Sequence, residues 1–80
     1  MREKLAELCH DQWSNWMEYL FQKCTHNIHT GEMTIPAWAV DRWKRQMSTK
    51  YEFLSESEKE SDLKEADKFI KLWGENDKDV

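Results

Sequence analysis

Two residues near the start of the chain have the types and spacing to hold a planar ligand. His10 and Trp13 lie three residues apart within an apolar helical pattern. An indole offers a stacking face and an imidazole a directional hydrogen bond, which together suit a purine base. Met17 follows on the same side of the expected helix, where a pocket wall would lie. The alternative is structural: Trp13 is a core residue, and His10 satisfies a nearby carbonyl or carboxylate.

A second group is both basic and aromatic. Trp38, Arg42 and Arg45 are spaced at i, i+4 and i+7, so they share one face of a helix. Guanidinium groups can hold phosphates through paired hydrogen bonds, while an indole supports a base or a ribose. Lys44 and Lys50 would add positive charge. In the alternative interpretation, Arg42 stacks on Trp38 at the surface and the tryptophan seals a helix junction.

Other kinds of chemistry find little support in the sequence. Catalysis needs a nucleophile with its base, or paired carboxylates in a cleft, and the carboxylates here gather mainly in one solvated helix. Cys24, His26 and His29 have a C-x-H-x-x-H spacing that matches no common zinc motif. The two glycines are isolated, so no phosphate-binding loop is expected. We therefore expect a protein that is not an enzyme and that holds no metal and no cofactor.

Length and composition predict one small folded domain. Five Trp, three Phe and two Tyr among 80 residues can supply the dense core that so short a chain needs. The net charge of −4 argues against nucleic-acid binding. There is no apolar run long enough for a signal peptide or a membrane span. With only Cys9 and Cys24 present, we expect a cytoplasmic protein whose two thiols are free and partly buried.

Three helices are expected to position these residues. Apolar side chains recur at steps of three and four through residues 2–24, which predicts a first amphipathic helix. Its expected core positions are Leu5, Cys9, Trp13, Trp16, Met17, Leu20 and Cys24. Residues 25–34 interrupt the pattern and predict a short irregular or hairpin-like connection around Ile28 and Met33.

The second helix is expected to be capped by Thr34, with Pro36 in its first turn. Its buried stripe is expected to consist of Pro36, Val40, Trp43 and Met47. The linker of residues 48–54 carries two aromatic residues and a leucine, which we expect to attach it to the core.

A third helix is predicted to open at Ser55, because Ser55 and Glu58 form the S-x-x-E pattern of a capping box. Its expected buried side consists of Leu63, Ala66, Ile70 and Trp73. Gly74 is expected to end it. The predicted domain therefore spans residues 1–74, followed by a frayed polar tail at residues 75–80.

Two separated segments resemble one protein family. "LAELCHDQW" (residues 5–13) resembles the L-A-E-x-x-H-x-x-W opening of the ryanodine-receptor repeat (RyR) domain. "LSESEKESDLKEA" (residues 54–66) resembles its closing L-P-E-S-E-K-E-x-D-R-x-x-A, and Tyr51 matches the tyrosine three residues before that leucine. The chain has Ser55 in place of the family's proline and Leu63 in place of its arginine. Its middle differs, so no family contacts are carried over there.

The resemblance implies a mostly α, three-helix RyR-like fold and a non-enzymatic role. RyR domains occur in calcium-release channels as tandem pairs, some of which bind adenine nucleotides between the repeats, and as stand-alone bacterial and phage proteins. On this analogy His10 and Trp13 line the base pocket, and a solo copy forms a homodimer to complete it. The full set of expected ligand contacts is His10, Trp13, Met17, Trp38, Arg42, Arg45, Lys50 and Tyr51.

The function expected from this analogy is that of a phage-encoded sponge. It would bind and sequester a nucleotide-derived signal of host antiviral defence, of the cyclic-nucleotide or ADP-ribose type. The alternative is a protein-interaction module that docks on a host or phage protein through its Trp38 and Arg42 face. A weaker third option is that the acidic third helix mimics a nucleic-acid surface.

Overall fold

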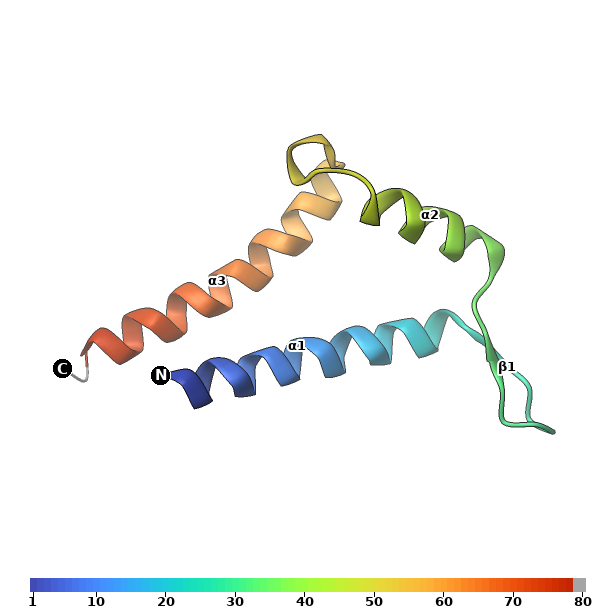
Figure 1. The fold of residues 1–80 in the computed structure, drawn as a ribbon, viewed down its shortest axis with the longest axis horizontal. Coiled ribbons are helices and arrows are strands. Elements are labelled where there is room, and N and C mark those ends of the chain that lie inside the picture. Colours follow the sequence, from blue (N-terminus) through green and yellow to red (C-terminus); the bar gives the residue numbers. More distant parts are fainter. Residues whose placement is uncertain (79–80) are drawn as a thin grey trace. The chain divides into compact units, whose positions relative to one another are not determined.

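The computed structural model describes residues 1–78, with side chains through residue 75. Within these residues the protein is mostly α-helical, with three α-helices and one two-stranded antiparallel sheet (Figure 1). The elements in chain order are α1 (Arg2–Lys23), β1 (Thr25–His26), β2 (Met33–Thr34), α2 (Ala37–Met47), the 3-10 helix η1 (Tyr51–Phe53) and α3 (Glu56–Lys78). The predicted fold class, three helices with a short β-like connection, is confirmed.

The chain divides into two compact units. The first unit consists of Met1–Ser14 together with the chain from Ser55 onward, and the second consists of Asn15–Leu54. Helix α1 therefore contributes its first half to one unit and its second half to the other.

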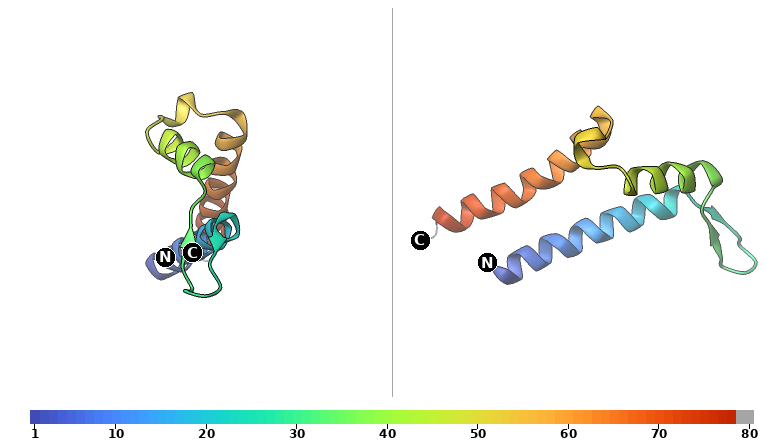
Figure 2. Two further views of the ribbon diagram at one scale, coloured as in Figure 1. Left: turned by 90° about the vertical axis from the view of Figure 1, so that its right-hand side faces the viewer. Right: turned by 45° about the horizontal axis from the view of Figure 1, so that its top comes forward.

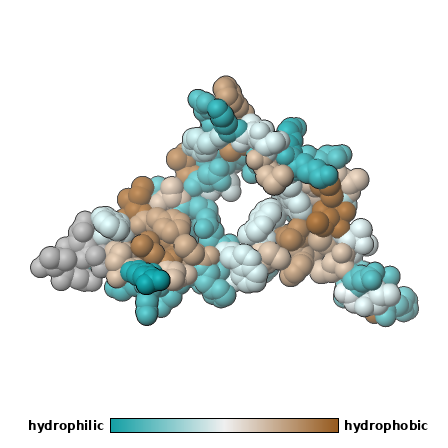
Figure 3. Space-filling model, viewed as in Figure 1, coloured by the Kyte–Doolittle hydropathy of each residue, from teal (hydrophilic) through white to brown (hydrophobic). Residues whose placement is uncertain are grey.

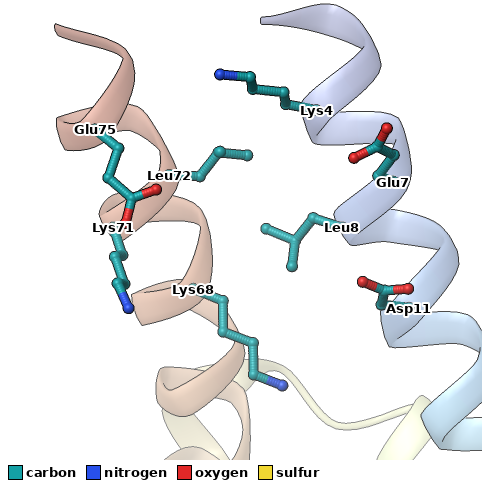
Figure 4. A pocket seen from close by; sticks show the side chains of 8 residues that line it. All are labelled: Lys4, Glu7, Leu8, Asp11, Lys68, Lys71, Leu72 and Glu75. Carbon is teal, nitrogen blue, oxygen red and sulfur yellow. The ribbon is translucent and has the colours of Figure 1, made fainter. Parts of the chain in front are cut away.

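In the first unit, α1 and α3 run antiparallel, so that the start of α1 lies beside the end of α3 in each view (Figures 1 and 2). Leu8 and Leu72 point toward one another between the two helices (Figure 4). Leu5 and Phe69 are also half-buried in this unit. These contacts are few, so the two helices cover only part of each other's apolar surface.

In the second unit, a hairpin connects the second half of α1 to α2. Thr25 pairs with Thr34 and His26 with Met33, which confirms the predicted hairpin-like connection. The Asn27 side-chain oxygen accepts hydrogen bonds from the backbone N–H groups of His29 and Thr30 at 3.0 and 3.3 Å. Gly31 has φ of 79°, a left-handed conformation that completes the turn and that favours glycine.

The predicted start of α3 is confirmed, whereas the predicted cap of α2 is wrong. The Glu58 N–H donates to Ser55 Oγ at 3.3 Å, which is the serine half of a capping box, and the Ser55 hydroxyl donates to Glu58 Oε1 at 2.7 Å. Thr34 lies in β2 instead of capping α2, and Pro36 is the N-cap, with ψ of 149°. A residue before proline is held in extended conformations, so the helix cannot begin earlier.

The expected buried side of α3 is wrong by about one residue position. Its predicted members Leu63, Ala66, Ile70 and Trp73 are all exposed. In the second half of α3 the half-buried side chains are instead Glu65, Phe69 and Leu72. Leu72 points toward α1 (Figure 4). Apolar residues occupy about half of the α3 circumference, and α1 covers one edge of that arc.

Other expected core positions are also exposed. Cys9, Trp13 and Trp16 in α1 are exposed. In the first unit α1 turns Leu8 toward α3, and Cys9 lies about 100° further round the helix. Met47 is exposed at the end of α2. The linker aromatics Tyr51 and Phe53 are exposed too, and Leu54 is the half-buried member of that segment. Among the described side chains, Ala39 alone is fully buried.

Helix α3 does not end at Gly74, as the sequence predicted, but continues to Lys78. A glycine is a weak stop signal unless it adopts positive φ, and Gly74 does not. The expected tail of residues 75–80 therefore begins as helix, and its last two residues lie outside the described part of the chain.

The two glycines should respond in opposite directions to alanine. Gly74→Ala should raise the free energy of unfolding by about 0.5–1 kcal/mol, since Gly74 is helical and no atom outside its neighbourhood lies within 4 Å of the added Cβ. Gly31→Ala should lower it by about 1 kcal/mol, because alanine at φ of 79° is strained. Urea titrations followed by circular dichroism measure both. A destabilising Gly74→Ala would contradict the continuous helix.

Candidate functional site

The predicted stripe on α2 is presented to solvent. We call Trp38, Arg42 and Arg45 the α2 stripe. All three side chains are exposed, with Trp38 at 51%. The opposite side of α2 holds the fully buried Ala39 and the half-buried Trp43. Because that side packs inward, the α2 stripe faces outward.

The cations of the α2 stripe have no partner within the described residues. Among the described residues, the ion pair joins Lys68 Nζ to Glu65 Oε1 at 2.9 Å, both in α3. The cation that lies over an aromatic ring is Lys23, 5.3 Å from the centre of Tyr19. Arg42 does not lie over the Trp38 ring, so the alternative in which the two stack on each other is wrong. Both guanidinium groups keep their donors available for an anionic group.

His10 and Trp13 contact each other. Their ring centres are 6.0 Å apart and the planes differ by 30°, a stacked arrangement. His10 Nε2 lies 3.5 Å from the Ser14 hydroxyl oxygen, one helical turn away. Trp13 is 59% exposed, so it is not a core residue. The partner of His10 is this hydroxyl instead of the expected carbonyl or carboxylate, and part of the indole remains open.

The eight predicted ligand contacts fall into both units. His10 and Trp13 belong to the first unit. The members in the second unit are Met17, Trp38, Arg42, Arg45, Lys50 and Tyr51. Helix α2 brings the three stripe residues together, and α1 brings His10 to Trp13. Met17 is half-buried, and Lys50 and Tyr51 follow α2 as exposed residues.

An aromatic cluster that the sequence did not predict as a group holds the second unit together. The rings of Trp16 and Trp43 meet edge to face with centres 5.4 Å apart. Tyr19 stacks on Trp16 at 5.5 Å and lies 6.3 Å from Trp43. We call Trp16, Tyr19 and Trp43 the aromatic cluster. The i, i+3 spacing of Trp16 and Tyr19 was a signal for it, but spacing along α1 could not identify Trp43 as their partner.

A shallow open groove of about 430 Å³ lies between α1 and α3 in the first unit (Figure 4). Leu8 and Leu72 form its apolar part, and its charged lining consists of Lys4, Glu7, Asp11, Lys68, Lys71 and Glu75. Three lysines and three carboxylates balance one another, so the groove does not select an anion. None of the eight predicted ligand contacts lines it.

Within the described residues, no cluster of His, Cys, Asp and Glu is placed to hold a metal ion. Cys9 and Cys24 are free thiols; Cys24 is half-buried as predicted, whereas Cys9 is exposed, contrary to prediction. No helix in the described part of the chain combines the length and the apolar character needed to cross a bilayer.

Comparisons with known proteins returned no relative: no protein-family model, no curated protein and no solved structure matches the chain. The resemblance to the RyR domain therefore remains a prediction from two sequence motifs.

The two tryptophans of α2 should differ in their effect on stability. Trp43→Ala removes a half-buried ring from the aromatic cluster and should lower the free energy of unfolding by about 2–4 kcal/mol. Trp38→Ala removes an exposed ring and should change it by less than about 1 kcal/mol. Chemical denaturation followed by circular dichroism measures both. Equal losses would contradict the assignment of Trp43 inward and Trp38 outward.

Proposed function

We propose that this chain is a non-enzymatic binding module that docks on an acidic protein surface through the α2 stripe. The observation that carries the proposal is that Trp38, Arg42 and Arg45 are exposed together, with neither arginine paired to a described carboxylate. The chain carries 16 acidic residues and 12 basic ones, so carboxylates are plentiful. Two adjacent unpaired guanidinium groups beside an indole are the composition found at the energetic centres of protein interfaces.

The shape of the α2 stripe favours a macromolecular ligand over a small one. Small molecules are bound in concave sites that cover most of their surface. The α2 stripe lies on the outward face of a helix, and none of its residues lines the groove. A flat or concave protein surface can supply the enclosure that this face lacks. Its carboxylates would receive paired hydrogen bonds from the arginines.

A charge-matched pair of variants tests this proposal. Arg42→Glu should weaken binding to the partner at least about 30-fold, because it replaces attraction with repulsion at the centre of the contact. Lys44→Glu makes the same charge change two residues away, off the stripe, and should weaken binding less than about 3-fold. Partners captured from expressing cells by the wild-type chain are purified, and their affinities for the three chains are measured by calorimetry. Equal losses for both variants would reject a specific stripe.

A second candidate function is the binding of a nucleotide-derived ligand, as the RyR resemblance implies. The specific observation in its favour is the stacked His10 and Trp13 pair, which leaves an exposed indole beside an imidazole. Sequestration of a defence signal in a phage-infected host would be its biological form. A ligand held there needs a second wall opposite the indole, because small molecules bind in sites that cover most of their surface.

Nucleotide binding has its own test. Thermal denaturation is measured in the presence of mono-, di- and cyclic nucleotides and ADP-ribose. If this candidate is right, at least one of them raises the melting temperature, and Trp13→Ala abolishes the rise while Phe21→Ala, an exposed aromatic elsewhere on α1, keeps it. No response to any ligand, with a protein partner lost on Arg42→Glu, would reject the sponge and favour docking.

A further inference from the structure

The first half of α3 carries two acids and a leucine on one side. Glu56, Glu60 and Leu63 are spaced at i, i+4 and i+7, and all three are exposed. We call them the α3 face. Leu72, which points toward α1, comes nine residues after Leu63, or two and a half turns (Figure 4). The α3 face therefore lies on the side of the helix opposite to its contact with α1.

Acidic and basic residues are segregated between the two units. Residues 55–67 contain six acidic residues and two lysines, whereas residues 15–54, the second unit, contain four acidic residues and five lysines and arginines. Figure 3 shows mainly hydrophilic surface over the first half of α3 and apolar surface over the paired ends of α1 and α3. The chain thus carries a surface of the kind that the α2 stripe is proposed to bind.

The α3 face matches the α2 stripe when the two helices lie antiparallel. Each set spans seven residues, about 10 Å along its helix. One antiparallel register places Trp38 opposite Leu63 at one end and sets Arg45 against Glu56 at the other. The middle members, an arginine and a glutamate, then fall within one residue of each other. A parallel helix would instead set Trp38 against Glu56 and Arg45 against Leu63, so that only one ion pair could form.

The charges beside the two sets agree with the antiparallel register. Asp41 on α2 and Lys59 on α3 lie on the same flank of the contact and fall within one residue of each other. On the other flank α2 carries the uncharged Gln46, and Lys64 falls beside the indole, as a cation beside an aromatic ring. Asp67 falls just before the first turn of α2, where a carboxylate complements the helix dipole. No like charges are brought opposite one another.

We propose that the α2 stripe of one chain packs antiparallel on the α3 face of a second copy. Arg42 then pairs with Glu60, and Arg45 pairs with Glu56. The inference rests on the proposed function, because it names the acidic surface that the α2 stripe binds. The chain's own α3 does not fill that role, since the α2 stripe and the α3 face are both exposed in the single chain. The contact is heterologous, because it joins different surfaces of the two copies.

Sedimentation equilibrium of the full chain, without any other protein, tests the contact. The wild-type chain should form species larger than the monomer at about 100 micromolar, and added salt should weaken them by screening the opposite charges. Arg42→Glu and Glu60→Arg should each raise the dissociation constant at least about 10-fold, because each sets like charges opposite one another. The double variant that carries both changes reverses the ion pair and should restore association to within about 3-fold of wild type.

Control variants reverse charges on other sides of the same helices. Lys44→Glu on α2 and Asp62→Arg on α3 make matched changes of charge and should leave the dissociation constant within about 3-fold. Circular dichroism establishes that each variant keeps its helix content. A wild-type chain that stays monomeric at about 1 mM, or a double variant that associates no better than the single ones, would overturn the inference. A monomeric chain that still loses a different acidic partner on Arg42→Glu would reject the second copy and keep the proposed function.

Discussion

The edge-to-face contact between Trp43 and Trp16 determines what the second unit can present to a ligand. With ring centres 5.4 Å apart and Tyr19 stacked alongside, the aromatic cluster fixes the rotation of α2 about its own axis. Ala39, one turn before Trp43, is fully buried on the same side. Once that side is turned inward, helical geometry leaves the α2 stripe no orientation but outward. The availability of Arg42 and Arg45 to a ligand is thus a consequence of ring packing between α1 and α2.

Little apolar surface is buried elsewhere in the described residues. The first unit has two helices, and two helices can cover only one edge of each other. Helix α3 carries apolar side chains over about half its circumference, which is more than α1 can contact. Exposed apolar surface of this extent costs free energy in water, so a surface that covers it stabilises the protein.

Sequence patterns predicted the helices well and their contacts poorly. The three helices, the hairpin-like connection and the Ser55 capping box all follow from local rules, because periodicity and capping act within a few residues. The buried side of α3 was placed one residue position away, since a helix that is apolar over half its circumference can turn either edge inward. Gly74 failed as a stop signal for a related reason: glycine permits a helix end but does not impose one.

The candidate sites show the same limit. Spacing was enough to place Trp38, Arg42 and Arg45 on one face, because a single helix determines that relation. Spacing was also enough to bring His10 beside Trp13. It could not show that Trp16 and Tyr19 meet Trp43, since that contact joins residues far apart in the chain.

Trp13 was predicted to be a core residue or a pocket wall, and the structure leaves it exposed with His10 stacked beside it. An exposed indole with His10 stacked on one face is a surface that a small ligand can bind, and that a second protein can bind equally well. The proposed docking on a protein rests on the α2 stripe, because two unpaired guanidinium groups on an open helix face can both engage a large acidic surface.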